Sequence, residues 1–349
     1  MNTPAFSGSS NKKLRMVQRD VVSVSKQELI RTVFVQPGQT LPLVVEPNLD
    51  AVDLSLWARN NTDFLERNLN QYGAILFRGF DLTSQNDFEQ AVNSMSVELM
   101  HYMEGATPRV QLSENIYTST EYPSNQSIEL HNELSYVTTW PGRVWFFCMT
   151  PSPEGGETPI ADIRRVLKRI DPIIVGQFER KGWMLVRNFG NDMSLAWQSV
   201  FRTEDRSTVD AYCRSAEVEV EWVDSQHLRT RQVRPPLAKH PNTGELGWFN
   251  HICFWHVSAL EPHVRDSMLA FFKEEDLPYN TYYGDGSAID ASVIEEIRNA
   301  YLQETVTFRW REKDLLMIDN MLVAHGRRPF VGPRKILVAM GNPRRDRGV

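Results

Sequence analysis

The chain has 349 residues, of which 41% are hydrophobic and 10% aromatic, enough for a substantial core and unlike a disordered or collagen-like protein. Its formal net charge of −6 gives no electrostatic reason to expect nucleic acid as a partner. The three cysteines are far apart and form no C-x-x-C pair, which argues against a disulfide framework or a thiolate metal site and favours a reducing cytoplasm.

The first hundred residues begin with a polar stretch and continue with alternating strand and helix patterns. Residues 1–25 are rich in serine, asparagine and charge, so we expect a flexible arm, and they lack the apolar region of a signal peptide. No apolar run approaches the roughly 18–20 residues that span a bilayer, so we expect no membrane as a partner. Gly73 is expected to end a helix as its C-cap. The predicted strands are 31–36, 41–47 and 74–80, and the predicted helices are 55–73 and 86–100.

From residue 127 onward, many short strands are separated by glycine and proline, a pattern that predicts a sandwich or barrel. Helical patterns fill an insertion at about 163–242, which could form a lid, and a segment at 263–275. The short basic tail at 344–349 is expected to be solvated. We therefore predict one catalytic domain, 1–349, that is mainly β with α insertions. The predicted strands of this part are 127–136, 143–149, 246–256, 306–310, 314–320 and 335–340.

A candidate metal site starts from His131 and Glu133. Residues two apart in a strand point to the same face, so this imidazole and this carboxylate could bind one metal from the strand 127–136. His325, which follows a strongly apolar strand, is the best third ligand. Two histidines and one carboxylate leave open positions on an octahedral iron(II) for a bidentate cosubstrate and O₂. The ordinary alternative is a pair of surface residues on a strand, with His325 as a turn residue before Gly326.

Arg334 lies nine positions after His325, at the start of the strand 335–340. A guanidinium that enters a barrel needs an anionic partner, since a buried unpaired charge is costly. A carboxylate bound in bidentate fashion is the natural partner. The alternative is a surface arginine at the edge of a strand. Because Arg334 follows a candidate metal ligand, an anionic cosubstrate that binds both the metal and Arg334 explains its position better than a surface arginine does.

With these residues in view, the sequence resembles the iron(II)- and 2-oxoglutarate-dependent dioxygenases of the taurine dioxygenase superfamily. Within that group it is most similar to the syringomycin-type and clavaminate synthase-like hydroxylases. The resemblance implies a double-stranded β-helix, a cupin-like jelly roll, with flanking helices. It runs from about Tyr72 to Met340 and includes STEYP at 119–123, LHNELSY at 130–136, GGETPIADIR at 155–164, TGELGWFNH at 243–251 and the block 319–340.

The resemblance also implies roles for individual residues. His131, Glu133 and His325 fall on the iron ligands. Arg334 falls on the arginine that pairs with the distal carboxylate of 2-oxoglutarate, and Thr158 falls on the threonine whose hydroxyl supports that carboxylate. From the residues alone, Thr158 could equally be a turn residue after two glycines.

Two departures from the family pattern narrow the function. Val338 stands where many relatives carry a second arginine, so an alkylsulfonate substrate such as taurine is not expected. The carboxylate ligand Glu133 is an aspartate in taurine dioxygenase-like enzymes and a glutamate in the clavaminate and syringomycin-type branch. Related halogenases replace this carboxylate with a small residue that leaves room for chloride, so Glu133 argues against halogenation.

The implied reaction is hydroxylation of an unactivated C–H bond in an amino-acid-derived substrate, with decarboxylation of 2-oxoglutarate to succinate, as part of natural-product biosynthesis. The substrate could be free or bound to a carrier protein. Desaturation, epoxidation or cyclisation would need only a different fate of the substrate radical. More remote alternatives are a zinc hydrolase with the same ligands and a non-catalytic jelly-roll binding protein. The chain could also form a homo-oligomer.

The candidate substrate contacts come from three parts of the sequence. Two residues share a strand face with His131, three lie in the aromatic run 246–256, and a basic residue of the run RTRQVRPP could meet a carboxylate or a phosphopantetheine. Core packing would explain the aromatic residues equally well, and basic residues of this kind more often line a solvated loop. His256 is interpreted as structural, and Arg234 is a second basic candidate. The candidates are Ser127, Glu129, Trp248, Asn250, His251 and Arg231.

Overall fold

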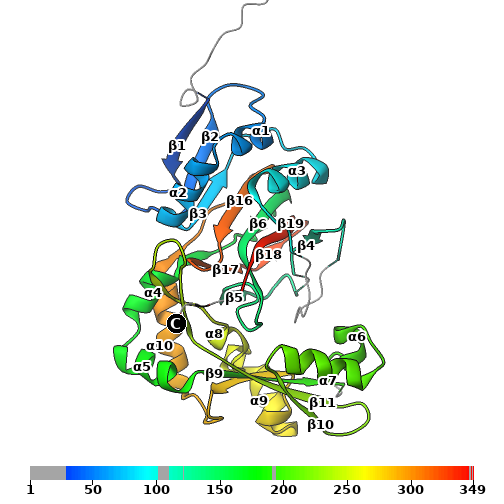
Figure 1. Cartoon of the computed structure of the whole chain (residues 1–349). Coiled ribbons are helices and arrows are strands. Elements are labelled where there is room, and N and C mark those ends of the chain that lie inside the picture. The colour runs from blue at the N-terminus through cyan, green and yellow to red at the C-terminus, as the bar shows by residue number, and fades with distance from the viewer. Residues whose placement is uncertain (1–28, 101–109, 121, 191–193, 346, 348) are drawn as a thin grey trace, which may run out of the picture.

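The computed structural model describes residues 29–100, 110–120, 122–190, 194–345, 347 and 349 (Figure 1). The arm expected at 1–25 lies outside these residues. The larger of two main sheets has seven strands, and β2 and β3 pair in parallel while the other neighbours are antiparallel. In spatial order the strands are β1 (Ile30–Phe34), β2 (Leu43–Pro47), β3 (Ala74–Phe77), β16 (Leu315–Asp319), β6 (Trp140–Thr150), β19 (Lys335–Arg344) and β4 (Ile116–Thr118).

The second main sheet has four strands and completes the jelly roll. Side chains alternate along a strand, so neighbours on β6 serve different cores. Phe146 packs into the core that also holds Ile160 and Val323 of the second sheet, whereas Trp145 and Phe147 pack under the N-terminal helices. The predicted double-stranded β-helix is confirmed. In spatial order the strands are β15 (Thr305–Val306), β8 (Ile160–Asp162), β17 (Val323–Arg327) and β5 (Ile128–His131).

Helices flank the two sheets. Those near the N-terminus lie beside β1, β2 and β3, while α4, α5 and α10 lie together on another side of the molecule (Figure 1). Two short pairs of strands, β12 (Leu237–Lys239) with β13 (Leu246–Trp248) and β7 (Glu154–Gly155) with β18 (Phe330–Val331), complete the fold. The helices are α1 (Leu54–Arg59), α2 (Thr62–Tyr72), α3 (Gln85–Met95), α4 (Ile163–Arg169), α5 (Pro172–Lys181), α6 (Trp197–Phe201), α7 (Arg206–Ser215), α8 (Ile252–Trp255), α9 (Pro262–Phe271) and α10 (Ala291–Glu304), with 3₁₀ turns η1 (Val257–Ala259) and η2 (Glu274–Asp276).

The insertion at 163–242 was expected to be helical, but it contains both helices and strands. It contributes α4 to α7, but it also supplies three strands of a separate antiparallel sheet, which we call the small sheet. Its fourth strand comes from beyond α9, and Figure 1 shows the sheet at the opposite end of the molecule from β1. In spatial order its strands are β10 (Glu219–Trp222), β11 (Leu228–Arg234), β9 (Trp183–Phe189) and β14 (Tyr279–Tyr283).

Several expected elements differ from the structure. The helix expected at 86–100 ends at Met95, and of the strand expected at 306–310 only Val306 belongs to a strand, β15. The helix at 55–73 is broken into α1 and α2 at Asn60, although Gly73 ends α2 in a left-handed conformation as expected (φ 75°). The strand expected at 246–256 ends at Trp248. The side chain of Asn250 then accepts the backbone N–H of Ile252 at 3.1 Å, and this bond starts α8 in place of further strand pairing.

The C-terminal tail is not solvated throughout, because Arg347 is buried. Its guanidinium donates to the carbonyls of Pro235 and Phe249, at 3.1 Å each, and to that of Ser135. It also lies over the rings of Trp140 and Phe249, 5.0 and 5.1 Å from their centres. Burial lowers the pKa of Arg347 to about 9. The expectation of a solvated tail is therefore wrong at this residue.

The three cysteines are all free and all buried. Burial raises the pKa of the Cys148 and Cys253 thiols to about 12. Within the described part of the chain, no helix has both the length and the apolar character needed to cross a bilayer.

Candidate active site

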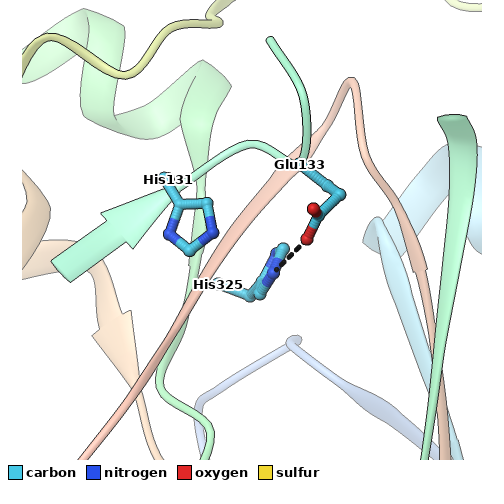
Figure 2. A group of neighbouring side chains, drawn as sticks. All are labelled: His131, Glu133 and His325. Carbon is cyan, nitrogen blue, oxygen red and sulfur yellow. Dashed lines mark ion pairs between the residues drawn. The ribbon is translucent and has the colours of Figure 1, made fainter. Parts of the chain in front are cut away.

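His131, Glu133 and His325 converge between the two main sheets. His131 ends β5 and His325 lies in the middle of β17, and the antiparallel register places these two histidines directly opposite each other. One potential ligand atom from each of the three residues lies within 4.8 Å of the others, and all three residues are buried. Figure 2 shows the three side chains pointing toward one another. The sequence-predicted triad is thus brought together in space.

Glu133 does not project from the same strand as His131. β5 ends at His131, and Glu133 lies in the turn that follows, where Leu134 has a positive φ of 52°. Asn320, fully buried, holds this turn in place. Its Oδ1 accepts the backbone N–H of Glu133 at 2.7 Å, and its Nδ2 donates to the backbone carbonyl of Glu133 at 2.8 Å. His131 and Glu133 therefore do lie together, but a turn tied to Asn320 brings them together instead of strand alternation.

The donor set fits a divalent metal. The carbonyl of Glu129 lies 2.8 Å from Nδ1 of His131, so the proton resides on Nδ1 and Nε2 keeps its lone pair for a metal. Nε2 of His325 lies 3.4 Å from Oε2 of Glu133. Nδ1 of His325 is buried and has no hydrogen-bond partner among the described residues. Two neutral imidazoles and one carboxylate are the ligand set of non-haem iron(II) oxygenases.

Arg334 and Thr158 line one pocket together with His131 and His325. The Arg334 guanidinium donates from Nε to the carbonyl of Gly156 at 2.9 Å, and burial lowers its pKa to about 10, so it remains charged near neutral pH. No described carboxylate forms an ion pair with it. The Thr158 hydroxyl accepts the indole N–H of Trp310 at 3.1 Å. An unpaired cation beside the two histidines suits an anionic ligand that reaches the metal.

Arg327 also lines this pocket and was missed by the sequence reasoning. It is buried, and its guanidinium donates to the carbonyls of Tyr122, Pro123 and Gln126. The signal was present, because Arg327 lies two positions after His325 and residues two apart share a strand face. Asn320, the other missed residue, gave no such signal.

His251 is the candidate substrate residue that lies beside the triad. Its ring centre is 4.9 Å from that of His131, and its Nδ1 lies 2.6 Å from the hydroxyl of Ser135. The ring stacks on Trp255 at 4.6 Å and 29°. Burial first, and then the neighbouring His131, hold the pKa of His251 well below its ordinary value, so the ring is neutral.

The other candidates from the aromatic run have structural surroundings. Trp248 is fully buried in the core against Phe178, with ring centres 5.5 Å apart. The side-chain amide of Asn250 donates from Nδ2 to the carbonyl of Pro236 and accepts the N–H of Ile252 at Oδ1. These positions favour the packing interpretation over contact with a substrate.

The basic and strand-face candidates also lie away from the triad or at the surface. Arg231 forms ion pairs with Glu219 and Glu221 of β10. Arg234 is buried and donates to backbone carbonyls, including that of Tyr136 at 2.9 Å. Neither arginine is therefore available to a substrate carboxylate as hypothesised. Ser127, just before β5, and Glu129, on β5, are both exposed. His256 caps η1 by accepting the N–H of Ser258, which confirms its structural role.

A jelly roll with this donor set has the architecture of a mononuclear metalloenzyme. Residues 37–340 match the family described as "Taurine catabolism dioxygenase TauD, TfdA family". The dapdiamide synthesis protein DdaC of Enterobacter agglomerans is 39% identical over 275 residues, 79% of this chain and 84% of that protein. The chain therefore belongs to the TauD, TfdA family, and it is an iron(II)- and 2-oxoglutarate-dependent dioxygenase.

More distant comparisons agree with this fold. A clavaminate synthase-like protein of Arabidopsis thaliana is 28% identical over 321 residues, 87% of this chain and 94% of that protein. PvcB of Pseudomonas aeruginosa, described as an Fe, alpha-ketoglutarate dependent oxygenase from an isonitrile synthetic pathway, superimposes with a TM-score of 0.54 at 17% identity, covering 92% of this chain and 94% of PvcB. AAD-2, solved with Mn(II) and N-oxalylglycine, gives 0.51 at 14% identity, covering 91% and 99%. At such identities these structures show the fold alone.

Proposed function

We propose that His131, Glu133 and His325 hold the iron and that Arg334 and Thr158 bind the distal carboxylate of 2-oxoglutarate. The observation that carries this proposal is the convergence of the three donors beside a pocket that also contains a half-buried arginine with no ion-pair partner among the described residues. A zinc hydrolase would need the three donors but would give no role to the Arg334 cation.

With O₂ and 2-oxoglutarate, the iron supplies the oxidising chemistry, which releases succinate and CO₂ and hydroxylates a C–H bond of the substrate. The chain's own residues position the reactants. The Glu129 carbonyl fixes the tautomer of His131, and Asn320 fixes the turn that carries Glu133. Arg334 offers a charged, directional partner to one end of the cosubstrate, so the other end is aimed toward the histidines.

We infer that the substrate is derived from an amino acid and that the reaction belongs to natural-product biosynthesis. The name of the 39% identical relative, a dapdiamide synthesis protein, supports this inference. Glu133 occupies the carboxylate ligand position, which favours oxygen insertion over halogenation. Hydroxylation is the proposed outcome, on a substrate that is free or tethered to a carrier protein.

A panel of L-amino acids, offered free and as thioesters on a carrier protein, tests the substrate class. Succinate release would identify the substrates that couple to turnover, and the mass change of each would identify the reaction. A gain of one oxygen is expected, whereas a loss of two hydrogens would show desaturation or ring closure. If no member of the panel raised the rate of succinate release above the rate measured without substrate, the amino-acid assignment would be contradicted.

The metal assignment is tested by His131→Ala, with the exposed His263→Ala on α9 as the matched control. Anaerobic titration with Fe(II) should show one bound ion per chain in the control and loss of that site in His131→Ala. Equal iron binding by both variants would contradict the triad.

The cosubstrate assignment is tested by Arg334→Gln, with the exposed Arg328→Gln as the control. A charge-assisted hydrogen bond contributes about 1.5–3 kcal/mol, so 2-oxoglutarate should bind roughly 10- to 100-fold more weakly to the metal-loaded Arg334→Gln protein. Calorimetric titration measures this constant. Unchanged affinity together with normal metal binding would remove Arg334 from the site.

A further inference from the structure

Arg187 is a buried cation for which the described residues provide no polar partner. It lies in β9, at the centre of the small sheet, and its side chain is only 7% exposed. Among the described residues its guanidinium forms no hydrogen bond or ion pair, and its Nε is fully buried. Nearby Arg229, by contrast, pairs with Asp276. A buried, unpaired guanidinium is destabilising, so its presence calls for a ligand or a function.

Arg187 projects toward the jelly roll. Residues two apart on β9 share a face, so Arg187 lies on the same face as Leu185. The register places Gln232 and Thr281 on either side of Leu185, and these two side chains donate to the carbonyls of Tyr136 and Ile252, at 3.0 and 2.9 Å. This face therefore meets the segments that carry the turn of Glu133 and the helix α8.

A row of stacked rings connects Arg187 with the triad. The Arg187 Cζ lies 5.5 Å from the centre of the Tyr279 ring, and Tyr279 stacks on Trp255 at 5.6 Å and 10°. Trp255 stacks on His251, and His251 contacts His131. The guanidinium thus lies between the rings of Phe189 and Tyr279, 4.8 and 5.5 Å from their centres, and Tyr279 begins a series of ring contacts that ends at His131, a candidate metal ligand.

We propose that Arg187 binds a carboxylate of the substrate, and this proposal rests on the proposed function of the triad. The planar guanidinium matches a carboxylate in bidentate geometry. The rings between Arg187 and His131 would contact an apolar segment, so the recognised molecule is an acid whose carboxylate is separated from the oxidised carbon. Thr230, opposite Arg187 in the register, places a hydroxyl beside the same position. This role replaces the one first assigned to Arg231, whose cation is already paired on the other face of the sheet.

Arg187 is distinct from the cosubstrate arginine. Arg334 lines the pocket that holds His131, His325 and Thr158, and Arg187 does not line that pocket. The two cations are carried by different sheets, Arg334 beside β19 and Arg187 on β9. A substrate acid and 2-oxoglutarate can therefore be bound at the same time without competing for one charge.

The test uses N-acetylglycine as the acid probe and N-acetylglycinamide as its neutral counterpart. Binding of each is measured from the rise of the unfolding midpoint, for metal-free protein and for protein saturated with Mn(II) and 2-oxoglutarate, at constant ionic strength. Wild-type protein and the control Arg231→Gln should bind the acid and not the amide. Arg187→Gln should bind the acid at least tenfold more weakly. Equal binding of acid and amide by the wild type, or equal binding of the acid by wild type and Arg187→Gln, would overturn the proposal.

A second measurement needs no ligand. Arg187→Met removes the unpaired charge and keeps most of the volume, so its unfolding midpoint should equal or exceed that of the wild type. A clear fall would assign Arg187 to packing of the small sheet and would overturn the proposal. The two hypotheses fail separately. If Mn(II) and 2-oxoglutarate do not stabilise the wild type while the acid probe does, the proposed function is wrong and the anion site remains.

Discussion

The side chain of Asn320 accepts the backbone N–H of Glu133 and donates to the backbone carbonyl of the same residue. It also donates to the carbonyl of Pro141 at 2.8 Å. Its own carbonyl accepts the side-chain amide of Asn132 at 2.7 Å. A carboxylate that follows a strand end would otherwise move with its turn. At the scale of single residues, the geometry of the candidate metal site therefore depends on a buried amide as well as on the three donors.

Asn320→Ala should weaken metal binding by about 10- to 100-fold, because residues that orient ligands typically have effects of this size. It should also lower the free energy of unfolding by about 1–3 kcal/mol, since the N–H and carbonyl of Glu133 lose their partner. Titration with Mn(II) and urea unfolding measure the two effects. The control Asn280→Ala removes an equally buried amide away from the triad and should lower stability alone. Equal metal affinity in both variants would contradict this role.

His256 makes stability depend on pH. Burial lowers its pKa from 6.5 to about 4. As pH falls through this window, the unfolded chain binds a proton that the folded His256 does not, so the free energy of unfolding falls, by up to about 3 kcal/mol at its lower end. His256→Asn keeps a side-chain acceptor for the Ser258 N–H and should reduce this decline. Urea unfolding of both proteins between pH 7 and 4 measures it, and parallel curves would show that His256 does not titrate there.

At the scale of elements, the register of β5 against β17 places the two histidines opposite each other, with a bulge between His325 and Arg327. The register shift places Gly326 of β17 opposite two residues of β5, Glu129 and Leu130. A Cβ at Gly326 would lie 2.5 Å from the carbonyl oxygen of Ile128, closer than any normal contact. Only glycine lets the two strands approach this closely.

Gly326→Ala should therefore push β17 away from β5, separate the two imidazoles and weaken metal binding at least tenfold, with a loss of stability on the order of 1–3 kcal/mol from overpacking. Metal titration and urea unfolding measure both. Gly176→Ala, within α5, is the control and should raise stability by about 0.5–1 kcal/mol without a change in metal affinity. Wild-type affinity in Gly326→Ala would show that the strands can separate without moving the histidines.

The sequence predicts the strands of the jelly roll better than it predicts the ends of elements. Apolar runs located β3, β6, β16 and β19, because a buried strand must be apolar. The end of β5 at His131 could not be predicted, since it depends on Asn320, a residue 187 positions away from Glu133. The pairing of Arg231 depends likewise on the small sheet, which forms only when β9, β10, β11 and β14 meet. His131 and Glu133 could be identified as a candidate pair because they lie two positions apart, and Arg334 because it follows His325 by nine positions, whereas Arg187 needed the tertiary structure.

At the scale of the whole molecule, Arg347 connects the C-terminal tail to segments near the triad. Its guanidinium contacts the carbonyls of Ser135, Pro235 and Phe249, which lie far apart in the sequence. Ser135 in turn contacts His251, which lies against His131. Arg347 therefore stabilises the surroundings of the site, and its guanidinium donates to none of the candidate ligands.

Arg347→Met should lower the free energy of unfolding by about 1–3 kcal/mol, because buried carbonyls lose their donors. The control Arg345→Met changes an exposed side chain bonded to Thr139 and should shift stability by no more than about 0.5 kcal/mol. Urea unfolding of the two variants gives the comparison. A similar small effect in both would mean that the cation does not hold these three segments together.

The burial of all three cysteines makes the protein suitable for site-specific labelling. Thiol reagents attack thiolates, and the raised pKa values of Cys148 and Cys253 leave almost no thiolate at neutral pH. Cysteines introduced at exposed Leu56 on α1 and Val223 after β10 would then react ahead of the native ones. A pair of spin labels or fluorophores at these two positions would report, in solution, any change in distance between the N-terminal helices and the small sheet when a substrate acid binds.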